Sequence, residues 1–155
     1  MKNIILNIDP VAISIGPINI YWYGIAYMLG MLLGLYYAKK IVNKQKINSD
    51  LSIDQRDIDE IFLWIVVGII LGSRIGYALF YNIDFYIANP ISIFALWKGG
   101  MSFHGGVIGV LVAIISYSYV YKKPILELGD VICAVVPIGL FFGRIANFIN
   151  GELWG

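Results

Sequence analysis

The sequence predicts an all-α polytopic membrane protein with four transmembrane helices. Of its 155 residues, 59% are hydrophobic and only 14% are charged, and the mean hydropathy is +0.79. A soluble domain carries more charge, about 25%. The apolar residues are gathered into runs that are long enough to cross ~30 Å of hydrocarbon as helices. The net charge of +1 gives no basic surface, so nucleic acid is not expected as a partner.

The four predicted spans cover residues 18–38, 61–81, 105–121 and 128–150. Gly30 and Gly34 give the first span a small face on which another helix can pack closely. In the loop that follows, Ser52 and Gln55 have the spacing of a capping box. Before the third span, Ile91 to Trp97 is predicted to form a short helix at the membrane interface.

The distribution of Lys and Arg predicts the orientation of these spans. The loops after the first and third spans carry seven such residues, whereas the opposite side carries only Lys2 and Lys98. Because basic residues concentrate in cytoplasmic loops, both termini are predicted to lie outside. Residues 1–155 then form a single integral-membrane domain. The start of the first span, the end of the second, His104 and the end of the chain share its outer face.

Two arginines interrupt the predicted spans at matching depth. Arg74 lies seven residues before the end of the second span, and Arg144 lies six before the end of the fourth. At helical rise both lie roughly 10 Å below the membrane boundary. One interpretation is that each arginine snorkels to the headgroups or pairs with Asp130 or Glu152. The other is that each binds a lipid phosphate, which a guanidinium contacts bidentately.

Polar residues follow Arg144 closely. Asn147 is three residues away and shares its helical face, and Asn150 continues that face. Either asparagine could act together with Arg144 on this face, or it could simply form a hydrogen bond between helices. Glu152 is either an exposed interfacial carboxylate or part of a site with Arg144.

His104 is the only histidine, and it stands between glycines at the mouth of the third span. A lone histidine is often structural or simply exposed. Beside two arginines in an outer-leaflet crevice, it is a candidate general base, since the reference pKa of histidine is ~6.5. No second histidine or cysteine cluster supports a metal site, and no metal or other cofactor is expected.

These residues lie in motifs that resemble those of the prolipoprotein diacylglyceryl transferases of the bacterial cytoplasmic membrane. At one position, Ala146, glycine is commoner in the family, and this small-for-small change should still allow close packing. The motifs are collinear along the whole chain: Asp9-Pro10, Ser14-Ile15-Gly16-Pro17, Trp22-Tyr23-Gly24, Gly76-Tyr77, Phe80-Tyr81-Asn82, His104-Gly105-Gly106 and Gly143-Arg144-x-Ala146-Asn147-Phe148-x-Asn150-x-Glu152-x-x-Gly155.

The resemblance implies an enzyme that moves diacylglycerol from phosphatidylglycerol to the lipobox cysteine of a prelipoprotein signal peptide. It implies a multi-pass protein of the bacterial cytoplasmic (inner) membrane, with its active site toward the outer leaflet. His104 and Arg144 would be the catalytic pair. The positions expected to bind phosphatidylglycerol are Arg144, Arg74, Tyr23, Asn147, Asn150, Glu152 and Gly155.

Two further expectations bear on this function. Family members continue past this point, so the chain is expected to be the N-terminal portion of a longer enzyme. The alternative function is a non-enzymatic membrane protein that binds or transports anionic lipid. The transferase predicts that Arg74, Arg144, His104 and Asn147 surround one shared cavity open to lipid.

Overall fold

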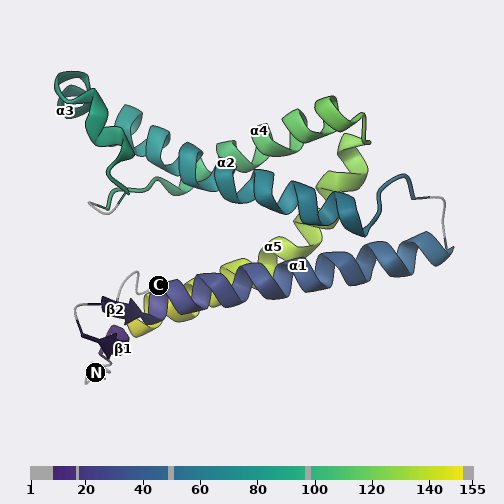
Figure 1. The fold of residues 1–155 in the computed structure, drawn as a ribbon, viewed down its shortest axis with the longest axis horizontal. Coiled ribbons are helices and arrows are strands. Elements are labelled where there is room, and N and C mark those ends of the chain that lie inside the picture. The colour runs from purple at the N-terminus through teal and green to yellow at the C-terminus, as the bar shows by residue number, and fades with distance from the viewer. Residues whose placement is uncertain (1–8, 17, 49–50, 97–98, 152–155) are drawn as a thin grey trace, which may run out of the picture. The chain divides into compact units, whose positions relative to one another are not determined.

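The computed structural model describes residues 9–16, 18–48, 51–96 and 99–151. Its helical content confirms the predicted all-α membrane class, with a small β-hairpin added near the N-terminus (Figure 1). Four described helices are long and apolar enough to cross a membrane: α1 (Trp22–Asn48), α2 (Gln55–Tyr81), α4 (Phe103–Tyr121) and α5 (Ile125–Ile149).

The chain divides into two compact units. The first unit joins the residues up to Lys44 with those from Asp130 onward, and the second unit is Gln45–Gly129. The first therefore holds the β-hairpin, most of α1 and most of α5. The second holds α2, α4 and two short elements between them, helix α3 (Ile83–Ala88) and the 3-10 helix η1 (Pro90–Phe94).

The β-hairpin corrects the predicted start of the first span. Strand β1 (Val11–Ile15) pairs antiparallel with β2 (Ile18–Tyr21), so residues 18–21 are extended rather than helical. Branched Ile18 and Ile20 favour a strand, and Gly16 turns the chain with φ +59°. The Trp22 N–H then donates to the Pro10 carbonyl (3.0 Å), which ties the start of α1 to the hairpin.

Close packing of α1 on α5 confirms the predicted small face. A Cβ built on Gly30 would lie 3.3 Å from Gly139 Cα, and one on Gly34 would lie 3.9 Å from Val135 Cβ. Gly30, the earlier of the two glycines, contacts Gly139, the later of the two partners on α5, so the two helices run antiparallel. Ala146 is fully buried further along α5, as expected for a small residue in a packed interface.

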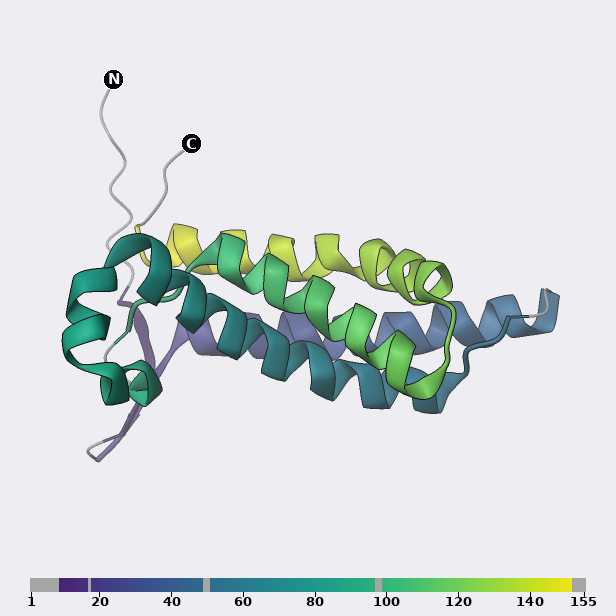
Figure 2. The same cartoon turned by 90° about the horizontal axis from the view of Figure 1, so that it is seen from above.

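Glycines also bring α2 and α4 together, a pairing that the sequence did not predict. A Cβ on Gly68 would lie 2.5 Å from the Gly109 carbonyl oxygen, and one on Gly76 would lie 2.7 Å from Gly105 Cα. The two backbones are therefore in direct contact, in an antiparallel arrangement that Figure 2 shows along the helices. This contact needs glycine at each of these positions.

The start of α2 differs from the prediction by six residues. The N-cap is Asp54, whose side chain accepts hydrogen bonds from the N–H groups of Arg56 (2.8 Å) and Asp57 (3.1 Å). The Asp57 carboxylate accepts one in return from the Asp54 N–H (2.8 Å). The capping box is therefore Asp54 with Asp57, and the predicted box of Ser52 and Gln55 is wrong. The bonds from Asp57 and Arg56 hold the pKa of Asp54 below its ordinary value.

An ion pair joins the start of α2 to the chain after α4. Lys123 Nζ lies 2.7 Å from Asp57 Oδ2, and this hydrogen bond raises the pKa of Lys123. The buried Tyr117 hydroxyl donates to the same carboxylate (3.1 Å). Polar contacts thus join the start of α2 to the end of α4 at one end of the second unit, whereas His104 lies at its other end.

Candidate functional site

Arg144 stands exposed on the last turns of α5. Among the residues that the structure describes, no carboxylate or hydrogen-bond acceptor contacts its guanidinium. The predicted pairing with Asp130 does not occur, and Glu152 lies outside the described residues. All of the donors of Arg144 are therefore available for an anion, as far as the described chain extends.

Tyr23 lies at the start of α1, level with the end of α5 in the antiparallel packing. Its hydroxyl donates to the Tyr27 hydroxyl (3.2 Å), and the two rings are 4.8 Å apart. A Cβ on Gly143 would lie 3.6 Å from the same Tyr27 oxygen. Continuing the register of Gly30 with Gly139 along α1 places Tyr23 level with Ala146, next to Asn147. The first unit thus gathers two tyrosines and the polar end of α5 at one end.

The two predicted asparagines differ in their surroundings. Asn147 is half-buried on α5. Asn150 follows the helix, and its buried Oδ1 has no hydrogen-bond partner among the described residues. A buried acceptor normally finds a donor, so this oxygen suits a hydroxyl or N–H group that enters the site. Glu152 and Gly155 lie outside the described residues.

His104 occupies the first turn of α4, directly after the phenylalanine that opens the helix. Its ring is exposed and lies edge-to-face with Phe103, with centroids 5.8 Å apart. The next two glycines are buried against α2, where a Cβ on Gly106 would lie 2.7 Å from Ser73 Oγ. The glycines beside His104 therefore serve helix packing, and the imidazole itself stays accessible.

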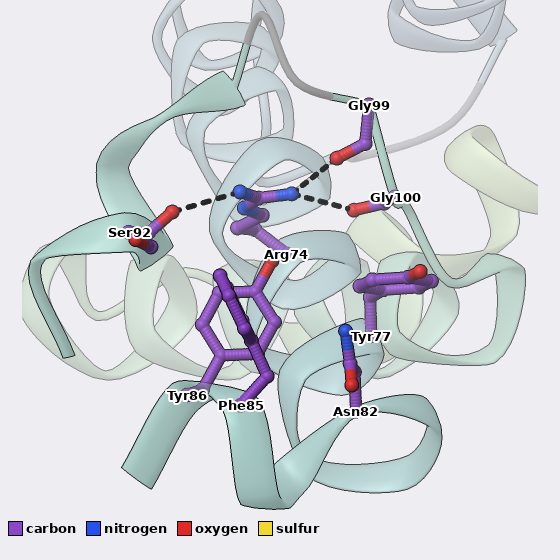
Figure 3. A pocket seen from close by; sticks show the side chains of 8 residues that line it. All are labelled: Arg74, Tyr77, Asn82, Phe85, Tyr86, Ser92, Gly99 and Gly100. Carbon is purple, nitrogen blue, oxygen red and sulfur yellow. Dashed lines mark hydrogen bonds between the residues drawn. The ribbon is translucent and has the colours of Figure 1, made fainter. Parts of the chain in front are cut away.

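Arg74 has surroundings that the sequence did not predict. It is only 3% exposed on α2, and no carboxylate pairs with it in the described parts of the chain. Its planar guanidinium instead faces the chain on either side of it, as Figure 3 shows. Its five N–H groups donate to backbone carbonyl oxygens, those of Ser92 (2.9 Å), Ile93 (2.9 Å), Ala95 (2.9 Å), Gly99 and Gly100 (3.1 Å).

These bonds leave Arg74 without a free donor for a phosphate. Snorkelling, the other interpretation of this residue, does not occur because the side chain is buried. The arrangement favours a structural role, and phosphate binding by Arg74 stays a prediction. The surrounding pocket has a volume of about 190 Å³, and its wall includes three aromatic side chains, Tyr77, Phe85 and Tyr86. Tyr86 lies under the guanidinium with its ring centroid 5.4 Å from Cζ, and Tyr77 lines the opposite side (Figure 3).

The short helix that the sequence predicts at residues 91–97 is part of this arrangement. It is the 3-10 helix η1, which begins one residue earlier, at Pro90. Trp97 lies outside the described residues. Ile91 and Phe94 are 83% and 75% exposed, so the element presents apolar side chains outward and carbonyl groups inward to Arg74.

The predicted site residues thus fall into two groups. Tyr23, Arg144 and Asn147 belong to the first unit, whereas Arg74 and His104 belong to the second. A cavity shared by both groups stays a prediction. Within the described ranges no cluster of three His, Cys, Asp or Glu side chains could hold a metal ion.

Comparison with known proteins adds the family context. The model of the prolipoprotein diacylglyceryl transferase family matches residues 10–155. A phosphatidylglycerol–prolipoprotein diacylglyceryl transferase of Rhodopseudomonas palustris is 55% identical over 148 residues, 95% of this chain and 52% of the relative. Relatives of the same name from Agrobacterium fabrum and Paramagnetospirillum magneticum are 51% and 48% identical, with 96% of this chain and 54% of each relative covered. The chain spans about half the length of the curated relatives it matches.

Proposed function

Because the chain belongs to the prolipoprotein diacylglyceryl transferase family, we propose that it transfers the diacylglyceryl group of phosphatidylglycerol to a prelipoprotein cysteine. The observation that carries this proposal is the family match over residues 10–155, which includes every predicted site residue. The reaction is the first step of lipoprotein maturation. The protein acts within a bacterial cytoplasmic membrane, and its substrates meet at the outer leaflet.

Arg144 is the phosphate ligand in this proposal. Its guanidinium is exposed on α5 and engages none of the described residues, so it can take two phosphate oxygens at once. The charge that develops on the leaving glycerol phosphate is then stabilised by the planar pair of donors of the guanidinium. Arg144 therefore contributes to binding the donor and also to breaking its bond.

His104 is the general base. It takes the proton of the lipobox thiol, whose reference pKa of ~8.5 leaves it mostly protonated at neutral pH. The thiolate attacks the carbon of the diacylglyceryl group that bears the phosphate, a carbon–sulfur bond forms, and the bond between that carbon and the phosphate oxygen breaks. Glycerol 1-phosphate leaves with the bonding electron pair. The proton on His104 returns to the phosphate monoester or to water, so the imidazole ends the cycle neutral.

The remaining polar groups hold the donor lipid. Tyr23 and Asn147 lie at one end of the first unit, beside Arg144 on α5. The Oδ1 of Asn150, which has no hydrogen-bond partner among the described residues, suits a hydroxyl of the glycerol headgroup. Glu152 and Gly155 complete this set by their place in the family motif. The four long helices are long and apolar enough to cross a membrane. In this proposal each crosses once, so that the start of α1, the end of α2, the start of α4 and the end of α5 would share one side.

A lipidation assay tests this function. The chain is reconstituted in phosphatidylglycerol vesicles with a lipobox peptide, and mass spectrometry follows addition of a diacylglyceryl group to the peptide. The Rhodopseudomonas palustris relative is the positive control, and a Cys→Ser peptide is the negative control. We expect transfer that His104→Gln lowers by about 100-fold or more.

Two results would contradict the proposal. If His104→Gln kept most of the rate, the base assignment would be wrong. Phosphatidylglycerol binding without any transfer, under conditions in which the relative is active, would instead indicate a protein that binds or transports anionic lipid.

A further inference from the structure

Arg74 joins two irregular stretches of chain between α3 and α4. Ser92, Ile93 and Ala95 supply carbonyls from η1 and its end, and Gly99 and Gly100 supply two more. Irregular backbone near a membrane needs a partner for each carbonyl, because lipid offers none. One buried guanidinium provides five donors in a fixed plane, and so it orders both stretches against α2 at the same time.

The same contacts lead directly to the start of α4. Gly100 lies between Arg74, which donates to its carbonyl, and the Tyr77 ring, which a Cβ at this position would approach to 2.5 Å. Its φ of +81° also requires glycine. Two residues later, the Ser102 N–H donates to the Ser73 carbonyl (2.9 Å). The chain before α4 is therefore held first by Arg74, at Gly100, and then by Ser73, at Ser102.

Ser102 then sets the first turn of α4. Its side-chain oxygen accepts a hydrogen bond from the Gly105 N–H (3.2 Å), and its carbonyl accepts one from the Gly106 N–H (2.9 Å). His104 lies between these anchored residues while its ring is exposed. Its position is thus determined by a short series of contacts that begins at Arg74.

We propose that Arg74 is a positioning residue for His104, acting through Gly100 and Ser102, and that it is not a phosphate ligand. The role in transfer rests on the proposed function, in which His104 is the base. The geometric part does not: loss of the Arg74 contacts loosens the start of α4 and changes the surroundings of the imidazole, whatever the protein catalyses.

The single histidine makes the geometric part directly measurable. The untagged chain, labelled with ¹³C and ¹⁵N at histidine, gives one imidazole signal by NMR in detergent micelles. Arg74→Met is compared with Arg56→Met, which replaces an exposed arginine at the other end of the same helix. We expect the signal to move or broaden in Arg74→Met and to stay unchanged in Arg56→Met. Arg74→Lys, with three donors for five carbonyls, should give an intermediate effect.

Gly100→Ala provides a second variant, which keeps Arg74 but displaces the carbonyl that it binds. It should also move the histidine signal. If Arg74→Met does not fold, as judged by circular dichroism, then Gly100→Ala and Arg74→Lys test whether Arg74 positions His104. Folded variants with a wild-type histidine signal would overturn the proposal.

Kinetics separate positioning from phosphate binding. In the lipidation assay, Arg74→Met should lower kcat by about 100-fold, the effect of a misplaced catalytic group, and leave KM for phosphatidylglycerol unchanged. A raised KM with unchanged kcat would show phosphate binding and contradict the proposal. If the wild-type chain shows no transfer, the proposed function fails, and the NMR comparison still tests the positioning.

Discussion

Arg74 and Arg144 lie at similar depths in their helices but have opposite surroundings. The sequence correctly marks both as costly groups that need a partner. It does not distinguish between them, because the partners of Arg74 are backbone carbonyls. Every residue has a backbone carbonyl, so residue types do not reveal these partners. Their positions depend on how the chain between α2 and α4 folds back. The one available signal is Gly99-Gly100, a pair that permits positive φ just before a helix.

The exposed arginine gives the sharper prediction at this scale. Arg144→Gln should reduce transfer by about 100-fold to 1,000-fold, because a donor that stabilises developing charge is removed. Arg144→Lys should recover only part of this loss, since an ammonium cannot contact phosphate with a planar pair of donors. Initial rates in phosphatidylglycerol vesicles measure both. Arg56→Gln serves as the control, and a full rate in Arg144→Gln would contradict the assignment.

Among the elements, all four long helices follow from hydrophobic length, but their ends do not. The hairpin takes residues 18–21 from the first predicted span, since strand pairing with Val11–Ile15 outweighs their apolar character. At α2 the helix also covers Gln55 to Glu60, which lie before the predicted span of residues 61–81. Hydropathy locates the apolar core of a span, whereas the caps and ion pairs of Asp54 and Asp57 determine where the helix begins.

The glycine interface of α2 with α4 is tested by adding a methyl group. Gly109→Ala should destabilise the protein by about 1–3 kcal/mol, because the new Cβ would meet backbone atoms of α2. Gly129→Ala is the matched control: this glycine is also helical, and a Cβ there meets nothing within 4 Å. It should be neutral or slightly stabilising, by about 0.5–1 kcal/mol. Denaturation in micelles followed by circular dichroism compares the two variants, and equal stabilities would argue against backbone contact.

The start of α2 distinguishes the observed capping box from the one predicted by sequence. Asp54→Ala should cost about 1 kcal/mol of stability, since two helix N–H groups lose their acceptor. Ser52→Ala should have little effect, because the Ser52 side chain does not cap the helix. The same unfolding assay applies. A larger loss of stability in Ser52→Ala than in Asp54→Ala would instead support the capping box of Ser52 and Gln55 that the sequence predicts.

The Lys123–Asp57 ion pair predicts a pH dependence at the alkaline side. The pKa of Lys123 is raised in the folded protein, so its contribution to stability is fully present below the ordinary value of about 10.5. This contribution is lost as the pH rises through the higher folded value. The difference in stability between the wild type and Lys123→Met should therefore shrink above about pH 10.5. A difference that stays constant from neutral to strongly alkaline pH would show that the charge of Lys123 does not stabilise the fold.

At the scale of the whole molecule, the site residues divide between two units of the chain. Tyr23, Arg144 and Asn147 come from α1 and α5, and His104 comes from α4. The family motifs identify these residues from sequence because each is embedded in a short, recognisable block. Their assembly into one site depends on packing between helices, which neither spacing nor hydropathy determines. The proposed function therefore requires that the proposed phosphate ligand, Arg144, and the proposed base, His104, meet around one lipid headgroup.

That requirement can be measured at His104 itself. Phosphatidylglycerol added to the labelled chain in phosphatidylcholine-containing micelles should shift its imidazole signal, because the bound headgroup lies beside the base. The shift should saturate, should be absent with added phosphatidylcholine, and should disappear in Arg144→Gln. An equal shift in Arg144→Gln, or no shift in the wild type, would contradict a site that Arg144 and His104 share.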